Sequence, residues 1–85
     1  MSFTPTSITM ADAGQALREG LAAIAQGDAA IDLSRLARFD SSAVSAVLAW
    51  RRAAGARGVT LQIAGVPEGL SSLALLYGLQ DFIAS

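Results

Sequence analysis

The spacing of apolar positions along the chain predicts three helices separated by short strands. In the first helical segment, Leu17, Leu21 and Ile24 recur at i, i+4 and i+7, which gathers them on one face. The preceding stretch Thr9–Asp12 has the S/T-x-x-acid spacing that opens a helix. Gly27 stands where a C-terminal cap is needed. These features predict an amphipathic helix that packs against the rest of the chain.

Two short apolar runs predict strands on either side of a second helix. The first, Ala30–Leu33, is apolar apart from Asp32, whose carboxylate is best placed at the strand end, within reach of a backbone N–H or an arginine. In the second, 59–64, apolar residues alternate with Thr60 and Gln62, which is typical of a half-buried strand. Two strands joined through a helix are expected to be parallel.

The second helix is predicted to begin at Ser41 or Ser42 and to run to about Ala54. Asp40, Ser41 and Ser42 are of the types that cap helices, because their side-chain oxygens accept hydrogen bonds from unpaired N–H groups of the first turn. At 100° per residue, one side of this helix gathers an apolar set that we expect in the core. This set is Ala43, Val44, Ala46, Val47 and Trp50.

The opposite side of the second helix has an unusual composition. It carries Ser41, Ser45, Ala49 and Arg52, with Ser42 and Leu48 at its margins. These side chains are mostly small, and charge appears only in the last turn, whereas a solvated helix face normally carries Lys, Glu or Gln. A small, flat face favours close approach of a partner protein. The alternative is an alanine-rich composition without function, because alanine is the best helix former.

The two ends of the chain give weaker patterns. Phe3, Ile8 and Met10 are the apolar anchors of the first ten residues, and Pro5 restricts any strand there to a short one at an edge. A last helix is predicted to open at Val66-Pro67-Glu68, with an acid where the helix dipole favours it. Its shared face is Leu70, Leu73, Ala74 and Tyr77; Gly78 ends it, and Leu79, Phe82 and Ile83 are expected to fold back as a short tail.

Four segments, in this order and spacing, carry a resemblance to a known family. They are Ile31-Asp-Leu-Ser, Phe39-Asp-Ser-Ser, Gly58-Val-Thr-Leu-Gln and Leu73-Ala-Leu-Leu-Tyr-Gly-Leu. Together they resemble the STAS domain, the fold of the anti-sigma-factor antagonists, and still more the MlaB-type branch found in lipid-asymmetry ABC transporters. The resemblance implies one α/β domain over residues 1–85, with a small mixed or parallel sheet and helices packed mainly on one face. STAS domains usually begin with a longer pair of strands than this chain provides.

Composition excludes several functions. The 85 residues carry a net charge of −1, without the basic excess expected of a nucleic-acid binder. There is no histidine and no cysteine, so the commonest general base and the thiolate are missing, and the acidic residues form no clustered pair. We therefore expect no enzyme activity, cofactor or metal. The apolar run from Ala43 to Trp50 is too short to span a bilayer, and the N-terminus does not have the pattern of a signal peptide.

The resemblance implies a non-enzymatic accessory subunit that binds the cytoplasmic ATPase of a phospholipid-transporting ABC complex, which maintains outer-membrane lipid asymmetry. Such a subunit is cytoplasmic and reaches the inner membrane through its partner. The expected partner-binding or regulatory residues are Asp40, Ser41, Ser42, Ser45, Leu48, Ala49 and Arg52. The alternative is an anti-sigma-factor antagonist that binds a serine kinase and is phosphorylated on Ser41, which occupies the position of the family's regulatory hydroxyl. The lipid, the direction of transport and the oligomeric state stay open.

Overall fold

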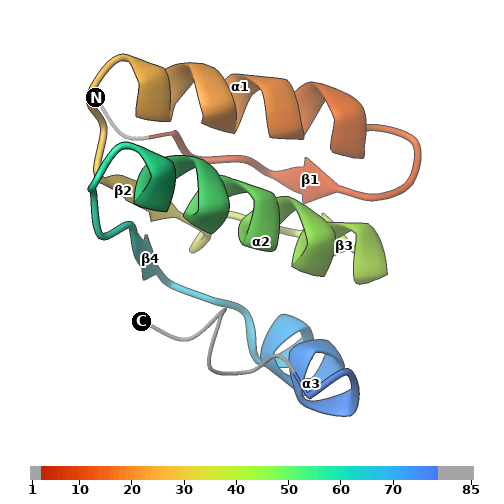
Figure 1. Ribbon diagram of the computed structural model, residues 1–85. Coiled ribbons are helices and arrows are strands. Elements are labelled where there is room, and N and C mark those ends of the chain that lie inside the picture. The colour runs from red at the N-terminus through yellow and green to blue at the C-terminus, as the bar shows by residue number, and fades with distance from the viewer. Residues whose placement is uncertain (1–2, 79–85) are drawn as a thin grey trace.

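The computed structural model of the chain describes residues 3–78 and has the expected α/β architecture (Figure 1). Its elements are β1 (Ser7–Ile8), α1 (Ala13–Ala25), β2 (Ala30–Asp32), β3 (Arg38–Phe39), α2 (Ser41–Ala56), β4 (Gln62–Ala64) and α3 (Glu68–Leu76). All three predicted helices are confirmed, and α2 runs to Ala56 rather than Ala54. The strand predicted over 59–64 is shorter than expected, because only Gln62–Ala64 pairs as β4. The predicted C-terminal tail lies outside the described residues.

The described strands form two parallel ladders, which lie toward opposite ends of the molecule in Figure 1. β2 pairs with β4, with Ile31 opposite Ile63, so the predicted parallel crossover through α2 is confirmed. β1 pairs with β3, with Ile8 opposite Phe39, and a single parallel bridge from Phe3 to Ile31 connects the N-terminal segment to β2. The N-terminal strand is short, as predicted. Sequence analysis did not predict β3.

Both long helices end in the same left-handed turn at a glycine. After α1, Gly27 has a φ of 103°, and the N–H of Asp28 donates to the carbonyl of Ala23 at 3.0 Å. After α2, Gly58 has a φ of 74°, and the N–H of Val59 donates to the carbonyl of Ala54 at 2.9 Å. These are Schellman-type ends, in which a residue without a Cβ allows the chain to satisfy carbonyls of the last turn. The predicted stop at Gly27 is confirmed.

The core is centred on Trp50, which is 0% exposed. Its indole N–H donates to the carbonyl of Leu17 at 3.1 Å, and the ring of Phe3 meets it edge-on at 5.6 Å between centroids. Gly20 of α1 lies directly against the indole, because a Cβ at that position would be 2.2 Å from its nitrogen. α1 and α2 lie side by side in Figure 1. They approach closely because Gly20 has no side chain to keep them apart.

Contact with Trp50 also changes which residues of α1 are buried. Ala16, Gly20 and Ile24 are the buried residues of this helix, whereas Leu17 and Leu21 are only partly buried against the core. The predicted side of α1 does face the core, but the residues at its centre are smaller than the predicted leucines. Close approach of the two helices requires small residues at the line of contact, so the leucines flank it.

The third helix buries part of its predicted face. Leu70 and Ala74 are buried and Leu73 packs against the core, as expected. The prediction for Tyr77 is wrong: this residue follows the last turn of α3 and is 57% exposed. The helix ends at Leu76, so the 3.6-residue period no longer fixes the direction of the tyrosine.

Candidate partner-binding site

Asp40 holds the N-terminus of α2 and connects it to a distant turn. Its backbone is extended, with a φ of −139° and a ψ of −162°, as a helix N-cap requires. One carboxylate oxygen accepts from the N–H of Ser42 at 2.8 Å, and the other accepts from the N–H of Met10 at 3.0 Å. The bond from Ser42, and then that from Met10, lowers the pKa of Asp40 below its ordinary value, although the nearby charge of Asp12 opposes this shift.

Asp12 organises the turn that carries Met10. Its carboxylate accepts from the hydroxyl of Ser7 at 2.5 Å and from the backbone N–H of Thr9 at 2.6 Å. The bond from Ser7 is the main cause that lowers the pKa of Asp12, followed by that from Thr9. The Thr9–Asp12 spacing predicts this bond, in which the N–H of Thr9 donates to the carboxylate of Asp12. The regular helix nevertheless begins only at Ala13.

The two aspartates hold Met10 at the surface, where it is 84% exposed. The expectation that Met10 anchors the N-terminal segment in the core is therefore wrong. Phe3 and Ile8 do pack in or against the core, since Ile8 is fully buried and Phe3 touches Trp50. The backbone N–H of Met10 donates to Asp40, which ties this turn to the N-terminus of α2.

An open groove of about 520 Å³ lies beside the first turns of α2. It is lined by Met10, Ser41, Ser42, Val44, Ser45, Leu48 and Tyr77, which we call the α2 groove. None of these side chains is charged. Four residues of the predicted site, Ser41, Ser42, Ser45 and Leu48, are thus brought together. Sequence analysis missed Met10 and Tyr77 as part of this surface, because they come from segments far from α2 along the chain.

The remaining predicted residues surround the α2 groove without lining it. Asp40 lies at its end as the cap of α2. Ala49 is half-buried and Arg52 is exposed, and both follow Ser45 and Leu48 along the helix. On the side toward α1, Ser42 and Ser45 also line a smaller hollow of about 270 Å³. Ser42 and Ser45 therefore lie between two depressions, and Ser45 is exposed there.

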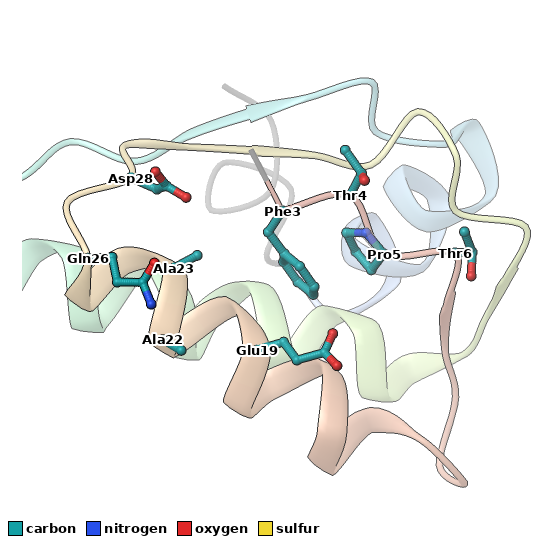
Figure 2. A pocket seen from close by; sticks show the side chains of 9 residues that line it. All are labelled: Phe3, Thr4, Pro5, Thr6, Glu19, Ala22, Ala23, Gln26 and Asp28. Atoms are coloured by element: carbon teal, nitrogen blue, oxygen red, sulfur yellow. The ribbon is translucent and has the colours of Figure 1, made fainter. Parts of the chain in front are cut away.

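A third hollow, of about 650 Å³, lies on another part of the surface (Figure 2). It is bounded by the N-terminal segment Phe3–Thr6 and by the α1 side of the molecule. Figure 2 shows the ring of Phe3 pointing toward the helices, with Glu19 and Asp28 on different sides of it. None of the predicted site residues lines this hollow, so we do not choose it as the candidate site despite its larger volume.

Two kinds of structural feature are absent from the described part of the chain. Between residues 3 and 78 no three acidic side chains come together as a metal site would require. No helix in the same range is long and apolar enough to cross a membrane. Ser41, the hydroxyl at the first position of α2, is exposed, but the chain has no histidine to activate it.

Comparison with known families agrees with the fold. The model of the family described as "Mlab, STAS domain" matches residues 6–84, nearly the whole chain. The chain belongs to the MlaB-type STAS family. STAS domains mediate protein–protein interactions and are generally non-enzymatic accessory domains. Comparisons with curated proteins and with solved structures gave no match.

Proposed function

We propose that this STAS domain is an accessory subunit of a phospholipid-transporting ABC complex that maintains outer-membrane lipid asymmetry. It binds the cytoplasmic ATPase through the outer face of α2 and is held at the inner membrane by that partner. The observation that supports this proposal best is the uncharged α2 groove, which gathers Ser41, Ser45 and Leu48 on the surface of an MlaB-type domain.

Docking on this face has a low desolvation cost. Ser41 and Ser45 expose small hydroxyls, so a partner can approach closely without displacing long side chains. Asp40, the cap that precedes α2, already accepts a backbone N–H bond at each of its carboxylate oxygens. A charge with such partners tolerates being covered far better than an unpaired one.

Ser41 acts in this proposal as a contact and not as a nucleophile. It is the first residue of α2 and is exposed, so its hydroxyl meets whatever docks there. A negative charge introduced at this position is tolerated by the fold, because it lies at the positive end of the helix dipole. The same charge must lose its water when a partner covers the surface. Binding and stability are therefore expected to respond differently to one substitution.

The test is the affinity for the purified transporter ATPase of two variants, Ser41→Glu and Ser45→Arg. Each is expected to weaken binding by about tenfold or more, because a buried unpaired charge at an interface costs at least that much. Melting temperatures should stay close to that of the unmodified protein. Ser71→Glu is the matched control, since Ser71 is an exposed serine on α3 outside the α2 groove.

Two results would contradict the proposal. Wild-type affinity of both variants would show that the ATPase docks elsewhere. Failure of the unmodified protein to bind the ATPase, together with phosphorylation of Ser41 by a purified anti-sigma kinase, would instead support the antagonist function.

A further inference from the structure

We infer that the partner element received by the α2 groove is an amphipathic helix with a defined pattern. Its apolar side chains fill the space between Met10, Leu48 and Tyr77, and a carboxylate about one turn further on pairs with Arg52. This inference rests on the proposed function and specifies the chemistry of the partner at the same surface.

The apolar part of the pattern follows from two side chains that the fold leaves uncovered. Met10 is 84% exposed and Tyr77 is 57% exposed, and both line the α2 groove together with Leu48. Methionine and tyrosine are among the residue types enriched at the centres of protein interfaces. They come from the turn before α1 and from the end of α3, so three separate elements contribute to one apolar lining.

The charged part of the pattern follows from Arg52. This residue is exposed and lies one helical turn beyond Leu48 on the same face of α2, about 6 Å along the axis. Among residues 3–78, no hydrogen bond or ion pair engages its guanidinium. Since the lining of the groove is uncharged, Arg52 is the charge that a partner lying along the outer face of α2 meets next. Complementarity therefore requires a carboxylate at that point of the partner.

The direction of the groove favours a helix as the occupant. Ser41, Ser45 and Leu48 follow one another along the axis of α2, so the groove runs beside the helix. Side chains at i and i+4 of a second helix insert into such a groove, which is the usual mode of amphipathic-helix recognition. An anionic membrane surface is a poorer occupant, because the groove is concave and the chain carries a net charge of −1.

The experiment measures the affinity of purified variants for the purified ATPase, with folding checked by thermal melts. Met10→Asp and Tyr77→Asp are each expected to weaken binding by about tenfold or more, as for central interface residues. Leu75→Asp is the matched control. Leu75 is 60% exposed near the end of α3, two residues before Tyr77, but it does not line the α2 groove. Its affinity should stay within about twofold of the unmodified protein.

The charged contact is tested separately. Arg52→Glu should weaken binding by about three- to tenfold and should flatten its dependence on salt, since a rim charge acts through screened electrostatics. Arg38→Glu, at an exposed arginine of β3, controls for net charge. A compensating change of one partner carboxylate to lysine should restore the affinity of Arg52→Glu.

The outcomes separate this inference from the proposed function. If the unmodified protein and the Met10 and Tyr77 variants bind the ATPase equally well, the inference that a helix binds in the α2 groove is contradicted. The proposal that the ATPase is the partner would still hold. If the unmodified protein does not bind the ATPase, both are overturned. Binding to vesicles of phosphatidylethanolamine and phosphatidylglycerol that is lost in Met10→Asp would assign the groove to a membrane and would also overturn the inference.

Discussion

The two faces of α2 lie in different surroundings. On the inner face, Val47 and Trp50 are completely buried, and the neighbouring helix comes so close that Gly20 has no room for a side chain. On the outer face, Ser41 and Ser45 are exposed beside an open groove. On the inner face, the space left by neighbouring side chains limits which residues fit. On the outer face, Ser41 and Ser45 are small and uncharged. Substitutions only two residues apart should therefore affect different properties.

The largest expected effect is on the inner contact between α1 and α2. Gly20→Ala should destabilise the protein by about 2–3 kcal/mol, even though alanine is normally the better helix former. The new Cβ would lie 2.2 Å from the indole nitrogen of Trp50 and 2.4 Å from the adjacent ring carbon, and this ring is fully buried. Chemical denaturation of the variant measures this loss.

Gly14→Ala is the control for that experiment. Gly14 lies in the same helix, but the nearest atom to a Cβ there is the flexible end of Arg18 at 3.5 Å. This substitution should leave stability unchanged or raise it by up to about 1 kcal/mol through helix propensity. Equal destabilisation by both substitutions would mean that close contact with Trp50 is not what selects glycine at position 20.

The next effect compares the two faces of α2 directly. Val47→Ala should cost about 1–3 kcal/mol, because it removes buried apolar surface and leaves a cavity. Ser45→Ala should change the free energy of unfolding by less than about 0.5 kcal/mol, since Ser45 is exposed. Thermal melts of both variants provide the measurement. A similar loss in both would contradict the division of α2 into a packed face and an open face.

The smallest effect concerns acid and the cap of α2. Because hydrogen bonds lower the pKa of Asp40 in the folded state, its contribution to stability is complete above the ordinary value of 3.8 and is lost as the pH falls through the lowered pKa. Asp12 behaves in the same way. The melting temperature should therefore fall below about pH 4, and Asp40→Asn should make this fall shallower while retaining an acceptable cap. An unchanged acid profile in Asp40→Asn would contradict the role assigned to the carboxylate.

Local spacing predicted the division of α2 well. The positions from Ala43 to Trp50 were assigned to the correct faces because helical periodicity depends only on neighbours in sequence. The same is true of the parallel pairing of β2 and β4, which follows from the length of the connection between them. The family resemblance, recognised on the later part of the chain, is confirmed by a match that begins as early as residue 6.

Contacts between distant segments were beyond the reach of such patterns. β3 has only two residues, Arg38 and Phe39, too few to show alternation, and it forms because β1 pairs with it. The role of Gly20 depends on a tryptophan in another helix. The turn that carries Met10 is bound to Asp40, thirty positions away along the chain. Periodicity identifies the side of a helix that is buried, but it does not identify the neighbour that covers it.

The two hydrogen bonds accepted by Asp40 have a consequence for the proposed complex, in the rate at which the partner would leave. Because one carboxylate binds the amides of both Met10 and Ser42, the turn before α1 and the first turn of α2 are held together before any partner arrives. Little ordering entropy then remains to be lost on association at this end of the surface. In the proposed complex, a surface held in place beforehand would lengthen the lifetime without adding a single contact.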